Sequence, residues 1–131
     1  MNPLLTMKLL NSFFTLLSEK CCDGGCSVAT VSLNPEHVIF KAHFPGHPVT
    51  PGVCIIAMVT EVLEHMKHRT LIVKTVKNLK FVNIISPLLA RDVEIVFQSI
   101  DEDDVALKSK GLLRDGDLIL TKFSIIYQIV D

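Results

Sequence analysis

The sequence predicts an α+β protein in which a curved antiparallel sheet wraps around one long central helix. Three observations lead to this prediction. The segment that follows Pro51 is apolar on every side, so a helix formed there has no face suited to water and must be buried. The chain from residue 70 to residue 130 is rich in Val, Ile, Thr and Phe and alternates in polarity, as β-strands do. Asp115-Gly116 marks a tight hairpin between two of those strands.

The region before the central helix predicts a helix, a strand and an extended segment. Residues 3–17 carry a broad apolar stripe at helical spacing, which indicates an amphipathic helix packed on the domain. Residues 27–33 alternate in polarity and predict a half-buried strand, with Ala29, Val31 and Leu33 on one side. Asn34-Pro35 is a turn signal, and we expect residues 36–42 to be extended.

The start of the central helix has its own signals. We expect Thr50 to cap the helix with its hydroxyl and Pro51 to occupy the first helical position, where its missing N–H is not needed. The backbone N–H groups of Gly52 and Val53 then lie at the positive end of the helix dipole, which suits an anion or a developing oxyanion. Polar residues return at 65–68, where the helix should end.

Beyond the helix we expect an antiparallel meander. The predicted strands are 70–85, which is either one long strand or a broken one, 91–100, 105–113 and 118–130. The side chains expected to face inward are Val93, Ile95, Phe97, Ile119, Phe123, Ile125, Tyr127 and Ile129. A charged turn at 101–104 joins the second strand to the third. One buried helix among long antiparallel strands leaves few architectures, and a sheet wrapped round the helix is the simplest.

Composition limits the class of protein. A chain of 131 residues suits a single domain, 1–131, with one core. Although 49% of the residues are apolar, no uninterrupted run reaches the roughly 18 residues that span a bilayer. No basic region precedes the N-terminal apolar residues and no small-residue cleavage site follows them, so we expect a soluble, cytoplasmic protein. A formal net charge of −1 gives no indication of nucleic-acid binding.

The four cysteines give little support for a disulfide or a metal site. Cys21, Cys22 and Cys26 flank a glycine turn, and Cys54 lies in the central helix. The paired spacing typical of zinc ligands is absent, so we expect no metal and no cofactor.

One segment identifies a family. His43-Phe44-Pro45-Gly46-His47-Pro48-Val49-Thr50-Pro51-Gly52-Val53 closely resembles the H-F-P-x-x-P-x-x-P-G-V segment of the hotdog-fold 3-hydroxyacyl-(acyl-carrier-protein) dehydratases of fatty-acid synthesis. Lys80-Phe81 and Ser86-Pro87 are similar to the family's K-F-x-x-P-V-x-P-G-D segment, but Leu88-Leu89 stands where that segment has Gly and Asp. The resemblance implies a hotdog fold and a homodimer, or a higher oligomer, whose subunits pair through their sheets.

The resemblance also implies roles for individual residues. His43 matches the family's catalytic base, and the backbone N–H of Gly52, helped by that of Val53, matches the position that binds the thioester carbonyl. The family's acid stands fourteen residues after the histidine, projecting from the central helix into the partner subunit's site, and here that position is Ala57. Glu61, one helical turn further on, is either a relocated acid or the point where the helix reaches solvent.

Two further groups complete the predicted site. We expect the acyl thioester to contact Phe44, Pro51, Val53, Cys54 and Ala57. The basic side chains that we expect to dock an acidic acyl carrier protein are Lys74, Lys77 and Lys80, which alternatively form a solvated strand edge.

Together these features predict a dehydratase acting on acyl-carrier-protein or coenzyme A thioesters. Two alternatives remain at this point. A hotdog thioesterase would use a helix carboxylate such as Glu61 to activate water, with His43 orienting the substrate. A non-catalytic acyl-binding or partner subunit would keep the fold with a disabled site, which Ala57 favours and His43 opposes.

Overall fold

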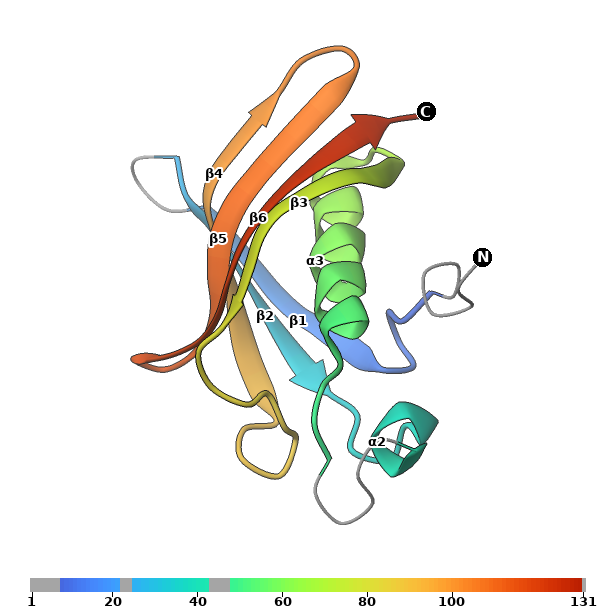
Figure 1. Ribbon diagram of the computed structural model, residues 1–131, viewed down its shortest axis with the longest axis vertical. Helices are drawn as coiled ribbons and strands as arrows, with labels where there is room; N and C mark the ends of the chain where they lie inside the picture. The colour runs from blue at the N-terminus through green and yellow to red at the C-terminus, as the bar shows by residue number, and fades with distance from the viewer. Residues whose placement is uncertain (1–7, 22–24, 43–47, 131) are drawn as a thin grey trace.

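The structure, a computed structural model, describes residues 8–21, 25–42 and 48–130 (Figure 1). Six strands form one antiparallel sheet in the order β1-β2-β4-β5-β6-β3. The strands are β1 (Phe14–Cys21), β2 (Ser27–Leu33), β3 (Leu71–Phe81), β4 (Asp92–Glu102), β5 (Ala106–Asp115) and β6 (Leu118–Ile129). Two helices are described, α2 (Val38–Ala42) and α3 (Gly52–Lys67).

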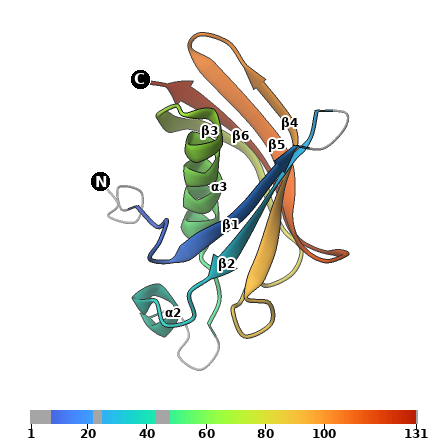
Figure 2. The ribbon, with the colours of Figure 1, turned by 180° about the vertical axis from the view of Figure 1, so that it is seen from behind.

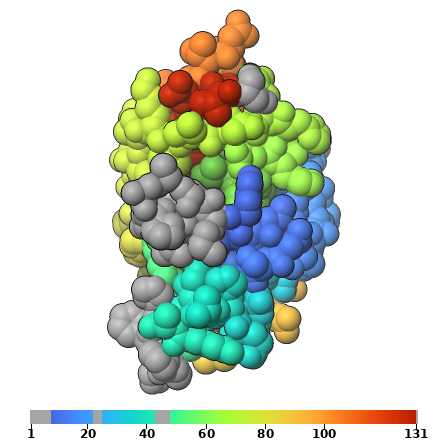
Figure 3. Space-filling model, turned by 90° about the vertical axis from the view of Figure 1, so that its right-hand side faces the viewer, coloured from blue at the N-terminus to red at the C-terminus, as the bar shows by residue number. Residues whose placement is uncertain are grey.

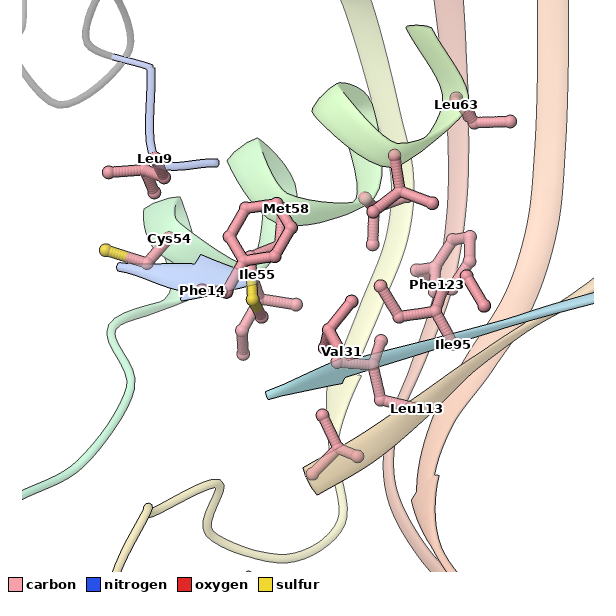
Figure 4. Packing of buried hydrophobic residues seen from close by; sticks show 14 of the residues in the cluster. Leu9, Phe14, Val31, Cys54, Ile55, Met58, Leu63, Ile95, Leu113 and Phe123 are labelled. Atoms are coloured by element: carbon pink, nitrogen blue, oxygen red, sulfur yellow. The ribbon is translucent and has the colours of Figure 1, made fainter. Parts of the chain in front are cut away.

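The sheet curves around α3, which lies along its concave face (Figures 1 and 2). The core fills the space between them, and Figure 4 shows Ile55, Met58 and Leu63 of the helix near side chains of the strands. The helix residues in the buried apolar core are Cys54, Ile55, Met58, Val59, Val62 and Leu63. The predicted arrangement of one helix against a curved antiparallel sheet is therefore confirmed.

Alternation in the sequence determines which strand faces carry the core. Ala29, Val31 and Leu33 of β2 are fully buried, as predicted, and so are Val93, Ile95 and Phe97 of β4. In β6 the predicted Phe123, Ile125, Tyr127 and Ile129 are buried, together with Leu120 and Thr121. Ile119 is the exception, because the register shifts between Leu113 and Arg114 of β5 and leaves Ile119 opposite Arg114. The prediction that Ile119 faces inward is wrong, because such a shift reverses the faces of the residues beyond it.

The predicted N-terminal helix is also wrong within the described residues. Phe14–Cys21 is the edge strand β1, in which Phe14 is buried, Thr15 is exposed and Leu16 is half-buried. This alternation pairs β1 with β2, an interaction that single-chain periodicity does not reveal. Residues 8–13 contain a turn and no helix, and residues 3–7 of the predicted helix lie outside the described residues.

The segment predicted to be extended before the central helix contains the short helix α2. Asn34 Oδ1 accepts a hydrogen bond from the Glu36 N–H at 3.0 Å, which confirms the turn at Asn34-Pro35. The ring of Phe40 then stacks on the ring of Phe13 with centroids 4.8 Å apart. The ring of His37 contacts Phe13 edge-on, with centroids 5.4 Å apart. Burial of Phe40 against a residue far away in the sequence favours the helical turn over an extended chain.

The central helix begins one residue later than predicted. Pro51 is the N-cap, with φ −64° and ψ 151°, and no side chain caps the helix. The Thr50 hydroxyl is therefore not a cap, because the residue stands one position before the N-cap. The predicted end is confirmed, since α3 ends at Lys67 and His68 takes a left-handed conformation with φ 53°, its N–H donating to the Glu64 carbonyl.

The remaining predicted strands are found with small shifts of their ends. The hairpin between β5 and β6 pairs Asp115 with Leu118, and Gly116 supplies the positive φ of 59° that its tight turn requires. Strand β3 is the second edge of the sheet, and most of its side chains are exposed. No helix in the described part of the chain is long and apolar enough to cross a membrane.

Candidate active site

A largely apolar pocket of about 500 Å³ opens beside the start of α3. Its walls come from the start of the helix, the segment between β3 and β4, and the β5–β6 hairpin. The lining residues are Val49, Thr50, Ile55, Phe81, Val82, Asn83, Ile84, Ile85, Ser86, Leu89, Ala90, Val93, Asp115, Leu118 and Leu120. This size and lining suit a flexible hydrocarbon chain.

Backbone donors at the first turn of α3 lie next to this pocket. The first N–H groups of the helix that find a backbone acceptor are those of Cys54 and Ile55, which both donate to the Pro51 carbonyl at 3.0 and 3.2 Å. For the N–H groups of Gly52 and Val53, the described residues provide no acceptor. These two donors at the positive end of the helix dipole are available to an oxyanion or a carbonyl oxygen.

Gly52 lies directly against the wall of the pocket. A Cβ added at Gly52 would lie 3.1 Å from Cζ of Phe81 and 3.8 Å from Cδ2 of Leu79. Phe81 lines the pocket, so the absence of a side chain at Gly52 lets the backbone of the helix start approach the pocket closely. The sequence predicted the donor at Gly52 but contained no signal for its contact with Phe81, which comes from β3.

The Thr50 hydroxyl is a polar group of this region to which the sequence assigned a different role. Thr50 lines the pocket, is 5% exposed, and its Oγ1 has no hydrogen-bond partner among the described residues. Its backbone is held in place, because its N–H donates to the Ile85 carbonyl at 2.8 Å. Sequence reasoning assigned this hydroxyl to the helix cap, and the shift of the helix start by one residue leaves it unused.

The other predicted substrate contacts are placed as follows. His43 and Phe44 lie outside the described residues. Val53 and Ala57 are half-buried on α3, with Ala57 about 7 Å along the axis from Gly52. Cys54 is fully buried in the core, and burial raises the pKa of its thiol to about 11. This thiol is therefore protonated at neutral pH and packs as a small apolar group.

Glu61 is buried and its carboxylate is already hydrogen-bonded. It is 8% exposed, so the expectation that the helix reaches solvent at this residue is wrong. Glu61 Oε1 accepts from the N–H groups of Leu9 at 2.9 Å and Leu10 at 3.0 Å, and Oε2 accepts from Leu9 at 3.0 Å. Figure 3 shows the blue N-terminal residues against the green of the helix region. Within one chain Glu61 lies about 14 Å along the axis from Gly52, and its role as an acid stays a prediction.

The neighbouring polar residues of α3 are also hydrogen-bonded. Thr60 Oγ1 donates to the Ile56 carbonyl at 2.7 Å and lies 3.1 Å from the hydroxyl of Tyr127. Glu64 Oε2 accepts from the Leu71 N–H at 3.0 Å. Burial raises the pKa of Tyr127 to about 12, so its hydroxyl stays protonated in the core. These groups fix the helix to the rest of the chain and lie away from the pocket.

The three predicted docking lysines lie on the exposed edge strand β3. Lys74 and Lys77 fall at the two register shifts of the β3–β6 pairing, and Lys80 stands directly opposite Lys122. Lysines and bulges on an edge strand also discourage further strand pairing, so this placement fits both predicted roles.

The described residues contain no group of three or more His, Cys, Asp or Glu side chains arranged to hold a metal ion. Cys21 is exposed, Cys26 is half-buried, and both are free thiols, as is Cys54. Cys22 lies outside the described residues.

The fold and the pocket place the chain among hotdog-fold proteins, and comparisons with known proteins define the family. Residues 19–110 match the model of the ApeI-like family, described as ApeI dehydratase. The chain therefore belongs to the ApeI-like dehydratase family.

Relatives and solved structures agree with this assignment. The 3-hydroxyacyl-(acyl-carrier-protein) dehydratase FabZ of Fusobacterium nucleatum is 30% identical over 77% of this chain and 72% of its own length. The FabZ of Latilactobacillus sakei is 26% identical over 75% of this chain and 74% of its own length. Among solved structures, the dehydratase heterocomplex ApeI:P from Xenorhabdus doucetiae aligns with a TM-score of 0.65 at 18% identity, covering 87% of this chain and 96% of that one.

Proposed function

We propose that the protein eliminates water from 3-hydroxyacyl thioesters carried by acyl carrier protein or coenzyme A. The observation that carries this proposal is the pair of N–H groups at Gly52 and Val53, which have no acceptor among the described residues, beside an apolar pocket of about 500 Å³. In the proposed complex the acyl chain occupies the pocket and the thioester carbonyl accepts from these N–H groups. Membership of a dehydratase family supports the same reaction.

The reaction needs three groups, and the proposal assigns two of them. His43 takes the proton from the carbon next to the thioester carbonyl, since an imidazole has a pKa close to neutral pH. The N–H of Gly52 stabilises the negative charge that develops on the carbonyl oxygen. The bond between carbon 3 and its hydroxyl then breaks, and the hydroxyl must receive a proton to leave as water.

The source of that proton separates two versions of the proposal. In the first, Glu61 is the relocated acid. The hydrogen bonds that its carboxyl group accepts from the N–H groups of Leu9 and Leu10 must then break, or the same carboxyl group must contact the substrate while keeping them. In the second, Glu61 only holds the N-terminal segment, and a carboxyl group from another chain completes the site. The half-buried Ala57 favours the second version, and the related ApeI:P dehydratase is a complex of two different chains.

Incubation of the purified protein with a 3-hydroxyacyl carrier-protein thioester, followed by mass spectrometry, tests the reaction. Loss of one water that disappears in both His43→Ala and Glu61→Gln would support the relocated acid. Loss of one water that survives Glu61→Gln would remove Glu61 from the chemistry. Release of free fatty acid would point to the thioesterase alternative, which needs Glu61 to activate water.

A chain that binds the thioester without converting it would support the partner-subunit alternative. In that case Ala57→Glu restores a carboxyl group at the position where the family has one. A gain of dehydration by Ala57→Glu would indicate a site disabled by that one substitution. No gain would mean that a partner chain must provide more than the acid. The next measurement would then add candidate partner chains to the assay.

We also propose that β3 contributes to a homodimer and to carrier-protein docking. The edge strand exposes Ile72, Val76 and Phe81 by 54%, 38% and 59%, which is a large apolar surface for one strand. Light scattering of the purified protein tests the dimer. Charge reversal at Lys77 and Lys80, with the exposed Lys20 reversed as the control, should weaken carrier-protein binding if these lysines dock the acidic partner.

A further inference from the structure

Two buried threonine hydroxyls lack hydrogen-bond partners among the described residues. They belong to Thr50, which is 5% exposed, and to Thr121 of β6, which is fully buried. A buried hydroxyl without a partner destabilises a protein, so each needs a physical reason. Of these two, only Thr50 lines the pocket.

The hydroxyl oxygen of Thr50 is itself buried, although the residue lines the pocket, so a ligand reaches it only if the side chain changes rotamer. Two other polar side chains of the pocket are already engaged: Asn83 Nδ2 donates to the Ile119 carbonyl at 2.8 Å, and Ser86 Oγ accepts from the Leu88 N–H at 3.3 Å. Thr50 carries Oγ1 and a methyl group on the same Cβ, so rotation about one bond exchanges their places. A ligand can therefore recruit this hydroxyl without any change in the backbone, which the Ile85 carbonyl holds.

Thr50 stands two residues before Gly52, whose N–H is the proposed donor to the thioester carbonyl. Two residues of extended chain span about 7 Å, which places the hydroxyl and the N–H at the two ends of a short polar head group. In a 3-hydroxyacyl thioester the carbonyl oxygen and the hydroxyl oxygen are on carbons 1 and 3. This short backbone spacing lets one ligand with oxygens on carbons 1 and 3 approach both residues.

We propose that the Thr50 hydroxyl binds the oxygen on carbon 3 of the acyl group and makes the pocket select 3-oxygenated thioesters over unsubstituted ones. This inference rests on the proposed function, since it assumes that the thioester carbonyl lies at Gly52. Thr50 acts as a specificity-determining residue that orients the leaving hydroxyl. It transfers no proton, because an alcohol is too weak an acid to replace a carboxyl group.

Calorimetric titration with 3-hydroxyoctanoyl and octanoyl pantetheine tests this proposal. The titrations use the His43→Ala background, so that turnover does not consume the ligand. We expect the 3-hydroxy ligand to bind about 10-fold more tightly, as one hydrogen bond of typical strength provides. Thr50→Val should abolish this preference and leave octanoyl binding unchanged, whereas Thr50→Ser should keep it.

Thr121→Val is the matched control, because it removes a buried hydroxyl without a partner that does not line the pocket. It should retain the 10-fold preference, and both valine variants should unfold at the same temperature as the parent or a higher one. A preference that survives Thr50→Val, or binding of both ligands with equal affinity in the parent, would overturn the role of Thr50 alone. Binding of neither ligand would overturn the proposed function together with it.

Discussion

The polar groups at the start of α3 and those in its last two turns differ in their hydrogen bonding. Around Glu61 and Glu64 the polar side chains are paired with backbone N–H groups of distant segments. At Thr50, Gly52 and Val53 the hydroxyl and the N–H groups have no partner among the described residues. Since folding normally satisfies buried polar groups, the first turn is the part of the helix left available for a ligand.

The two ends of α3 should also differ in what their substitutions change, which is stability at one end and ligand binding at the other. Substitutions in the last two turns should affect the free energy of unfolding, because their hydrogen bonds hold the N-terminal segment and β3 to the helix. Substitutions in the first turn should affect ligand binding and leave the fold intact. The following predictions test this division, from the largest expected effect to the smallest.

Glu61→Ala should reduce the free energy of unfolding by about 3 kcal/mol, because the buried N–H groups of Leu9 and Leu10 lose their acceptor. Urea denaturation measures this effect. Glu61→Gln keeps one acceptor oxygen and should lose only about 1 kcal/mol. If Glu61→Ala unfolds at the same urea concentration as the wild type, the last turns do not depend on these bonds and the comparison fails.

Tyr127, which contacts Thr60, should make the protein sensitive to alkali. Burial raises the pKa of Tyr127 from 10.0 to about 12, so the hydroxyl contributes stability below pH 10 that is lost as the pH rises to 12. This shift corresponds to about 2 to 3 kcal/mol. Denaturation midpoints measured between pH 9 and 12 should fall more steeply for the wild type than for Tyr127→Phe, and parallel curves would refute the burial of an ionisable hydroxyl.

Gly52→Ala should change the free energy of unfolding by less than about 1 kcal/mol, since alanine favours the helix and the one tight contact of the new Cβ is with the ring of Phe81 at 3.1 Å. The same contact presses on the wall of the pocket, so thioester affinity should fall. Thermal unfolding and calorimetric titration of one preparation give both quantities. A large loss of stability with unchanged thioester affinity would show that the first turn serves stability and not ligand binding.

Cys54 should react slowly with iodoacetamide at pH 8 although it belongs to the first turn. With a pKa of about 11, roughly one thiol in a thousand is ionised at that pH, and the side chain is fully buried. The exposed Cys21 provides the internal control in the same digest. Equal labelling of both cysteines by peptide mass spectrometry would show that the start of α3 opens readily.

The sequence by itself determined the helix and most of the sheet, because burial and alternation act locally. The apolar segment after Pro51, the alternation of Val93, Ile95 and Phe97, and the hairpin at Asp115-Gly116 each predicted an element that the structure contains. The spacing of histidine, prolines and glycine before α3 likewise identified the dehydratase family.

Only the tertiary structure decided how the polar groups are used. The acceptor role of Glu61 depends on Leu9, which lies 52 residues away, and the place of Gly52 in the pocket depends on Phe81 from β3. That the Thr50 hydroxyl does not cap α3 depends on a shift of the helix start by one residue. Hydrogen bonds and close contacts between distant segments leave no periodic pattern in a single sequence, so these features become visible only when the chain is folded.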